Sequence, residues 1–296
     1  MIEIQHYPVL LEEVLDAIPD VTGKVIIDAT FGQGGHSDAL LQKGATVLAF
    51  DWDIEAIQRG TTRFSKKIEE KKLYLVHASF DRLREIVSNH ELTKDGQKEI
   101  DAILFDFGTS RDQLLSSKRG FSFAGDGPLD MRMDQRLGVT AADLLAISDE
   151  HQLAKILFHF GGEVHSKKIA KIIKQHKKPI TSTSQLAAII SSIVSTRGKI
   201  HPATKTFQAL RVAVNSELDA IEKALPQALE VVKPSGKILA ISFHEGEDRL
   251  VKHAFRKWEE KSKGAAESKK PILATDEELK KNPPSRSAKL RIFIKK

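Results

Sequence analysis

The glycine-rich segment Asp28-Ala-Thr-Phe-Gly-Gln-Gly-Gly-His-Ser37 constrains the fold of this chain more than any other feature. It follows the apolar run Val25-Ile-Ile27 and precedes the helix-like Ala39-Leu-Leu41, which predicts a strand, a tight turn and a helix. Glycines in such a turn adopt positive φ and let the backbone approach a ligand closely. Asp51 closes the next apolar run, where a carboxylate can accept hydrogen bonds from two ribose hydroxyls. The turn and this carboxylate together predict a site for a nucleoside-containing cofactor.

The spacing of the glycines narrows the class of cofactor. Gly32-Gln-Gly-Gly35 lacks the G-x-G-x-x-G pattern with which dinucleotide enzymes hold a pyrophosphate. A tight strand-to-helix connection with no ligand is the alternative for the turn taken alone. With Asp51 after the next strand, a nucleoside without a pyrophosphate is the better interpretation.

Strand-like and helix-like segments alternate through the first part of the chain. Predicted strands lie at residues 25–28, 46–51, 73–77 and 103–106, with an amphipathic stretch at 54–64. This alternation predicts an α/β fold, a Rossmann-like doubly wound parallel sheet with helices on both faces.

The strand pattern stops after about residue 114 and returns near the end of the chain. Helix caps are predicted at Thr140, Ser148 and Thr183, and a single long helix at 207–232 precedes strands at 238–243 and 288–294. We therefore expect an α/β domain at 1–113 and 205–296 that is interrupted by an inserted helical domain at 114–204. Residues 259–287 are polar and basic, and we expect them to be mobile.

The composition excludes several classes of site. The chain has 296 residues, a formal net charge of +6 and no cysteine. The lack of cysteine excludes disulfides, thiolate metal sites and a cysteine nucleophile. The 11 histidines show no pair with carboxylates at a metal-binding spacing, so we expect no structural zinc. No run is apolar enough for a membrane helix and no targeting pattern is visible, so we expect a cytoplasmic protein without a membrane partner.

Polar or aromatic residues follow several of the predicted strands. Asp106 closes the fourth strand, where ligands bind in open α/β sheets, and Gln113 lies shortly after it. Phe80 follows the third strand and could stack on an adenine, with core packing as the alternative. His244 follows the fifth strand and could bind substrate, although a lone histidine is more often structural.

A loop rich in glycine, aspartate, phenylalanine and arginine covers residues 119–134. Its composition suits a clamp over a nucleotide, with phenylalanine for stacking and arginine for phosphate; a structural hinge is the alternative. Further along, Lys205 and Arg211 lie on a helix and could meet phosphates, unless they form only a solvated face. The residues predicted to contact RNA are Arg119, Phe121, Phe123, Arg132, Lys205 and Arg211.

Four segments, at 28–37, 119–134, 201–211 and 242–252, together resemble the cytosine-N4-specific methyltransferases of small-subunit ribosomal RNA, the bacterial MraW/RsmH family. The resemblance implies a class I S-adenosylmethionine-dependent methyltransferase fold with an inserted all-helical substrate domain. It also implies S-adenosyl-L-methionine as the cofactor. The family's cofactor contacts fall on Gly34, Gly35, His36, Asp51, Phe80, Asp106 and Gln113, each of which matches in residue type.

The implied substrate is a cytidine in the decoding region of 16S ribosomal RNA in the small ribosomal subunit, methylated on its exocyclic amine. An acceptor for the N4 hydrogens would raise electron density on that nitrogen. Asp106 is the first candidate for this catalytic role, followed by Asp130 and His244. Methylation at C5 would need a cysteine nucleophile, which the chain lacks.

The chain departs from the family pattern at two places, Arg111-Asp112 and Glu245-Gly246. These departures leave two alternatives open. One is a methyltransferase that acts on another RNA or on a small molecule. The other is a non-catalytic ribosome-assembly factor that binds the cofactor. The oligomeric state also stays open, with a homodimer among the alternatives.

Overall fold

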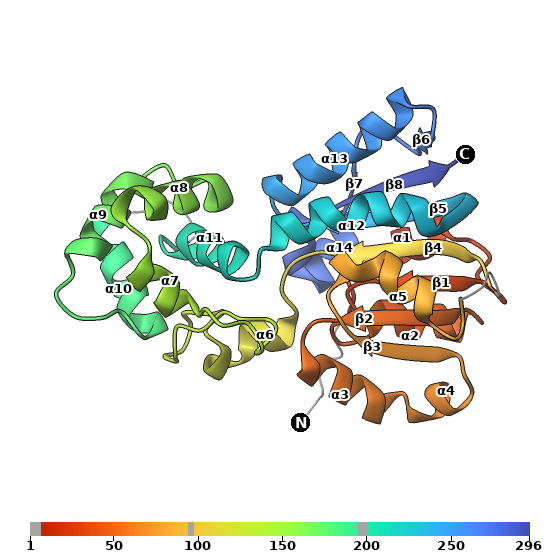
Figure 1. The fold of residues 1–296 in the computed structure, drawn as a ribbon, viewed down its shortest axis with the longest axis horizontal. Helices are drawn as coiled ribbons and strands as arrows, with labels where there is room; N and C mark the ends of the chain where they lie inside the picture. Colours follow the sequence, from red (N-terminus) through yellow and green to blue (C-terminus); the bar gives the residue numbers. More distant parts are fainter. Residues whose placement is uncertain (1–6, 94–97, 195–200) are drawn as a thin grey trace. The chain divides into compact units, whose positions relative to one another are not determined.

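The computed structural model describes residues 7–93, 98–194 and 201–296, and it divides into two compact units (Figure 1). The sheet unit consists of Met1–Gly108 and Leu218–Lys296, and the helical unit of Thr109–Glu217. Across the described ranges, we find no helix with the length and apolar character needed to span a bilayer.

A mixed sheet of eight strands forms the centre of the sheet unit, in the order β3-β2-β1-β4-β5-β8-β6, with β7 paired to β8. Strands β1 to β5 are parallel, whereas β8 runs antiparallel to β5, β6 and β7. The predicted doubly wound sheet is therefore confirmed. The strands are β1 (Val25–Asp28), β2 (Thr46–Asp51), β3 (Leu73–His77), β4 (Ile100–Asp106), β5 (Val232–Ser242), β6 (Gly264–Ala266), β7 (Ile272–Leu273) and β8 (Lys289–Lys295).

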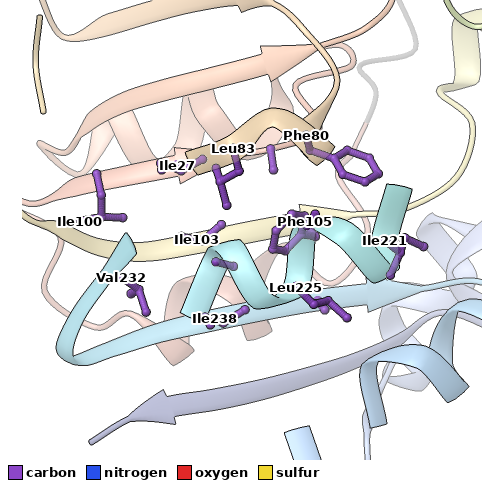
Figure 2. Close-up of a cluster of buried hydrophobic side chains, with 14 of the residues drawn as sticks. Ile27, Phe80, Leu83, Ile100, Ile103, Phe105, Ile221, Leu225, Val232 and Ile238 are labelled. Carbon is purple, nitrogen blue, oxygen red and sulfur yellow. The ribbon is translucent and has the colours of Figure 1, made fainter. Parts of the chain in front are cut away.

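Helices cover both faces of this sheet, so neighbouring residues of one strand enter different cores. Ile27 belongs to a cluster with Phe105 and Leu225, and Figure 2 shows side chains of the sheet and of α12 meeting there. Ile26 belongs to a second cluster with Leu40. The helices of this unit are α1 (Leu11–Ala17), α2 (Gly35–Gln42), α3 (Ile54–Arg63), α4 (Ser65–Glu69), α5 (Leu83–Asn89), α12 (Glu217–Val231), α13 (Glu245–Glu260) and α14 (Asp276–Lys281).

Between 109 and 217 the described residues form helices and loops, with one isolated β-bridge between Pro128 and Ser182. The capping box predicted at Thr140 is confirmed by the reciprocal bonds with Asp143. The helices at 150–161 and 183–193 are capped by Asp149 and Ser182, each one residue from the predicted position. The helices are α6 (Arg111–Leu115), α7 (Ala141–Ile147), α8 (Glu150–Gly161), α9 (Ser166–Gln175), α10 (Thr183–Ile193) and α11 (Thr204–Val214).

The prediction of one long helix at 207–232 is wrong. The structure has two helices there, and they belong mainly to different units. Helix α11 ends at Asn215, whose side chain bonds the backbone of Met131 and Met133, at 2.7 Å in each case. Ser216 then takes a positive φ of 49° and α12 begins. The division between the units consequently lies at 217/218, whereas the sequence predicted it at 204/205, and the first division lies at 108/109 instead of 113/114.

Residues 259–287, predicted to be a mobile segment, contain regular structure. Strands β6 and β7 pair with β8, and α14 follows them. Glu278 of α14 is buried and accepts the Leu10 N–H at 2.8 Å. Sequence composition missed this segment because its order comes from pairing and packing with distant parts of the sheet unit.

Candidate functional site

The glycine-rich turn lies between β1 and α2, as predicted. Gly32 and Gly34 have φ of 55° and 74°, and the Gly34 N–H donates to the Phe31 carbonyl at 2.7 Å. Gly34 occupies the N-cap position of α2 without a side-chain cap, so no side chain of its own blocks the end of the helix. A Cβ on Gly34 would lie 2.6 Å from the Phe31 ring, and one on Gly35 would lie 2.4 Å from Pro8. Both positions therefore require glycine.

Asp28, at the end of β1, is the buried anchor of this turn. One carboxylate oxygen accepts the Ser37 hydroxyl at 2.6 Å and the other accepts the Thr30 N–H at 3.2 Å. Burial raises the pKa of Asp28, although the Ser37 hydroxyl acts in the opposite direction. The Thr30 hydroxyl in turn accepts the N–H of Asp106 at 2.7 Å, which links β1 to the end of β4.

Asp51 is the last residue of β2 and is hydrogen-bonded to the same turn. Its carboxylate accepts the N–H groups of Gly32 and Asp53, at 2.7 and 2.8 Å. Burial raises the pKa of Asp51 to about 7, even though both backbone bonds lower it. A carboxylate with two backbone bonds still has lone pairs left for a ligand, which agrees with its predicted role beside a ribose.

His36 and Asp106 form a pair of polar side chains at the carboxyl edge of the sheet. Nε2 of His36 lies 3.6 Å from Oδ2 of Asp106, beyond hydrogen-bond distance. The His36 side chain is 6% exposed, yet neither of its ring nitrogens has a hydrogen-bond partner among the described residues. Oδ1 of Asp106 is also buried without one. Buried polar atoms of this kind need a partner, so the pair is the strongest local sign of a ligand site.

Phe80, predicted to stack on an adenine, belongs to an aromatic cluster of the core. It is 5% exposed, with ring-centroid distances of 5.5 Å to Trp52, 5.9 Å to Phe105 and 5.8 Å to Phe107. Most of the surface of Phe80 is therefore packed in the core, as the alternative interpretation predicted. Contact with a cofactor stays a prediction that concerns only the small exposed edge.

His244 follows β5 at the same edge and caps α13. Its Nδ1 accepts the N–H groups of Gly246 and Glu247, at 3.1 and 3.4 Å. Glu247 is fully buried and accepts the N–H groups of Phe243 and His244 in return. Because Nδ1 accepts, the proton of a neutral His244 ring is on Nε2, which lies 3.2 Å from Glu247. The structural role accounts for Nδ1 of this histidine, whereas Nε2 is buried without a hydrogen-bond partner among the described residues. Its catalytic role stays a prediction.

Asp130, the second predicted catalytic residue, lies in the helical unit and is engaged by Arg132. Both carboxylate oxygens accept from the guanidinium at 2.8 Å, and one accepts the Arg132 N–H at 3.0 Å. Burial acts to raise the pKa of Asp130, but the bonds from Arg132 outweigh it and hold the pKa below its usual range. An acceptor so occupied is poorly suited to take a proton.

The arginines predicted to contact RNA are used inside the helical unit. Arg119 is 7% exposed and donates to the carbonyls of Arg132 and Met133 at 3.0 Å. Arg211 forms a two-bond ion pair with the buried Glu217, at 2.8 and 2.9 Å. The structure therefore gives Arg119, Arg132 and Arg211 roles in holding the loop 119–134 and the end of α11.

The other residues predicted in this unit are placed as follows. Gln113 is buried and completes a capping box with Ser110 at the start of α6. Phe121 is buried, whereas Phe123 is half-buried and stacks on His201 with a centroid distance of 4.4 Å. Lys205 is exposed and donates to the Gly162 carbonyl at 3.1 Å. The sheet unit thus brings together Gly34, Gly35, His36, Asp51 and Asp106, and the helical unit holds the predicted RNA contacts.

Sequence reasoning missed residues that support the site. Thr30 positions the backbone of Asp106, and Pro8 packs against Gly35. The position of Thr30 inside the glycine-rich segment was an available signal, but nothing in the sequence places Pro8 there. Within the described ranges, no cluster of three or more potential metal ligands occurs.

Comparison with known proteins decides the family. A family model described as the MraW methylase family matches residues 3–296. The chain belongs to the MraW methylase family. The ribosomal RNA small subunit methyltransferase H of Coprothermobacter proteolyticus is 40% identical to it over 99% of this chain and 96% of the relative. The protein of the same name from Acinetobacter baumannii is 41% identical over 98% and 97%.

A solved rRNA methylase from Streptococcus thermophilus aligns with 98% of each chain at 10% identity and a TM-score of 0.46, so the assignment rests on the sequence relatives. Membership of the MraW methylase family and the observed strand order give the predicted class I methyltransferase fold with an inserted helical unit.

The two departures from the family pattern both lie in first turns of helices. Arg111 and Asp112 open α6, where Ser110 and Gln113 form the capping box. Glu245 and Gly246 open α13, and a Cβ on Gly246 would lie 3.1 Å from the His244 ring. Neither departure removes a residue of the cluster around His36 and Asp106.

Proposed function

We propose that this chain is an S-adenosylmethionine-dependent methyltransferase of small-subunit ribosomal RNA that modifies N4 of a cytidine in the decoding region. The observation that carries the proposal is the set of buried polar atoms without partners on His36 and Asp106 beside the glycine turn, in a chain that belongs to the MraW methylase family over its length. The names of the full-length relatives support small-subunit ribosomal RNA as the substrate. The restriction to N4 of cytosine is the finer step and rests on the chemistry below.

The residues at the carboxyl edge fit S-adenosylmethionine. Gly34 places no capping side chain at the start of α2, and the backbone N–H groups of its first turn suit a carboxylate. Asp51 would accept the ribose hydroxyls, and His36 and Asp106 would bond polar atoms of the cofactor or the substrate. Phe80 would offer its exposed edge to the adenine, and contact of Gln113 with the cofactor stays a prediction.

When bound, the cofactor supplies a methyl group on a positively charged sulfur. The chain must orient the cytosine amine, whose lone pair is delocalised into the ring and therefore a poor nucleophile. Positioning alone can supply several kcal/mol, roughly 7–11 in well-oriented intramolecular reactions. Asp106 would accept a hydrogen bond from N4, raise the electron density on that nitrogen and take its proton. Thr30 holds the Asp106 backbone for this task.

The amino-acid composition favours N4 over C5 of cytosine. Attack on C6 of the ring, which C5 methylation requires, is normally made by a cysteine, and the chain has none. The exocyclic amine needs only a well-placed acceptor. The target base must also be unstacked before its amine can reach the site.

The test uses small ribosomal subunits from a strain that lacks the cytosine-N4 modification. The full chain and labelled S-adenosylmethionine should yield N4-methylcytidine, identified by mass spectrometry of the digested RNA. Asp106→Ala should abolish the product, whereas the exposed Asp16→Ala, a matched control in the same unit, should not.

Two results would contradict the proposal. Cofactor binding without any labelled nucleoside would indicate a non-catalytic assembly factor. Label on a different nucleoside, or on free cytidine in preference to subunits, would indicate another methyltransferase substrate.

A further inference from the structure

The cations of the helical unit fall into two groups with different environments. Three arginines that are buried or half-buried bind carboxylates and carbonyls of their own unit, as shown for Arg119, Arg132 and Arg211. By contrast, five lysines on and just after α9 are exposed, and none has a carboxylate within 4.0 Å in the described part of the chain: Lys167, Lys168, Lys171, Lys177 and Lys178. Residues 164–178 contain no aspartate or glutamate at all.

Three of these lysines lie on one face of α9. Lys167 and Lys171 are four residues apart and Lys168 and Lys171 three, so their side chains are neighbours on the helix surface. The opposite face, with Ile169 and Ile173, is buried in the helical unit. We call the exposed stripe of Lys167, Lys168 and Lys171 the α9 lysine face.

An ordinary solvated helix face would show a mixture of signs. On other helices of this chain, some exposed cations pair with carboxylates one turn away, as Arg59 does with Glu55 and Lys281 with Glu277. On α9 the same spacing joins two like charges, which weakens a helix. The α9 lysine face therefore reduces local stability and is not explained by interactions within the described chain.

We infer that the α9 lysine face binds the sugar-phosphate backbone of ribosomal RNA outside the target nucleotide, an inference that rests on the proposed function. Lysine is a flexible point charge that meets phosphates without demanding one geometry, which suits contacts independent of sequence. Phosphate contacts set the register of a nucleic acid, while base contacts read it.

The test compares the triple variant Lys167→Gln/Lys168→Gln/Lys171→Gln with the unsubstituted protein. The affinity of each is measured for unmodified small ribosomal subunits and for deproteinised 16S ribosomal RNA. The control is Lys43→Gln/Lys66→Gln/Lys72→Gln, which removes the same charge from exposed positions of the sheet unit. Loss of three phosphate contacts should lower the slope of log affinity against log salt by about 2 and weaken binding about tenfold or more at low salt. The control should change neither quantity beyond a small uniform effect.

Methylation kinetics provide a second readout. The α9 variant should raise KM for subunits and leave the single-turnover rate at saturating subunits and the affinity for S-adenosylmethionine unchanged. A salt slope equal to that of the control would overturn the inference. Weaker binding to subunits but not to deproteinised RNA would also overturn it, because it would show that α9 docks on a ribosomal protein. If the unsubstituted protein does not methylate subunits but the α9 variant still has a lower salt slope, the proposed function is wrong and the α9 lysine face still binds RNA.

Discussion

Replacement of Gly34 by alanine tests whether packing, as well as backbone conformation, shapes the glycine turn. Gly34 has a φ of 74°, and a Cβ there would lie 2.6 Å from Phe31 and 2.8 Å from Phe64. Gly23, in the same unit, has a φ of 73° with nothing within 4 Å of its Cβ position. Gly23→Ala is therefore a matched control that meets the same backbone penalty without the contact.

The expected losses of unfolding free energy follow from the backbone conformation and from the Cβ contact. An alanine in the left-handed region costs about 1–2 kcal/mol, which is the whole effect expected for Gly23→Ala. A methyl group forced into packed rings adds roughly 1–3 kcal/mol, because the rings must leave their favoured positions. Gly34→Ala should thus lower the free energy of unfolding of the sheet unit by about 2–5 kcal/mol. Affinity for S-adenosylmethionine should fall as well, since the first turn of α2 shifts with the ring of Phe31.

Urea unfolding followed by tryptophan fluorescence measures the first effect. Both tryptophans of the chain, Trp52 and Trp258, lie in the sheet unit, so their emission reports on that unit. Calorimetric titration with S-adenosylmethionine measures the second effect. Equal destabilisation by the two substitutions, with cofactor affinity unchanged in both, would refute the reasoning, because it would show that the aromatic rings do not confine the turn.

Four further outcomes are expected. Affinity for S-adenosylmethionine should fall as pH drops through about 7, where Asp51 is protonated, and the dependence should disappear in Asp51→Asn. Because folding raises the pKa of Asp51, its contribution to the free energy of unfolding should be full at acid pH and lost as pH rises through about 7. Arg211→Met should cost about 3–5 kcal/mol in urea unfolding, because it removes the cation of the ion pair with the buried Glu217, whereas adding Glu217→Leu should recover much of the loss; an additive double variant would contradict the pairing. Glu278→Ala should cost about 1–3 kcal/mol, since the Leu10 N–H loses its acceptor, and Glu278→Gln should restore most of it.

The parallel part of the fold could be predicted from the sequence because its signals are local. The predicted ranges 25–28, 46–51 and 73–77 coincide with β1, β2 and β3, each an apolar run between turn residues. The start of β5 was missed, because Pro234-Ser-Gly236 has the composition of a turn. In the structure, these residues lie within the strand beside a register shift on β4, and Ser235 has a φ of 61°. A bulge depends on the partner strand, which local composition does not reveal.

The break between α11 and α12 has a similar cause. The sequence through residues 207–232 is helical in composition, and Asn215 alone is a weak signal for an end. Its side chain bonds the backbone of Met131 and Met133, far away in sequence, and these contacts fix the end of α11. The position of the boundary between the units therefore depends on tertiary contacts.

The candidate site shows the same division between local and distant causes. The glycine turn, Asp51 and Asp106 were found because each follows directly from a strand and the turn after it. The contacts of the arginines could not be predicted, since an arginine that binds phosphate and one that binds a buried carboxylate look alike in sequence. Arg211 forms an ion pair with the buried Glu217, and Arg119 donates hydrogen bonds to two carbonyls of its own loop.

This division changes which residues should be tested for RNA binding. Substitution of an arginine that holds its own unit together removes stability, and any loss of RNA affinity then follows from unfolding. Substitution on the α9 lysine face removes charge from an exposed helix surface whose lysines make no ion pair in the described chain, so it should weaken RNA binding and reduce its salt dependence without loss of stability. A basic residue in this family member therefore has to be sorted by its internal partners before its charge is assigned to the substrate.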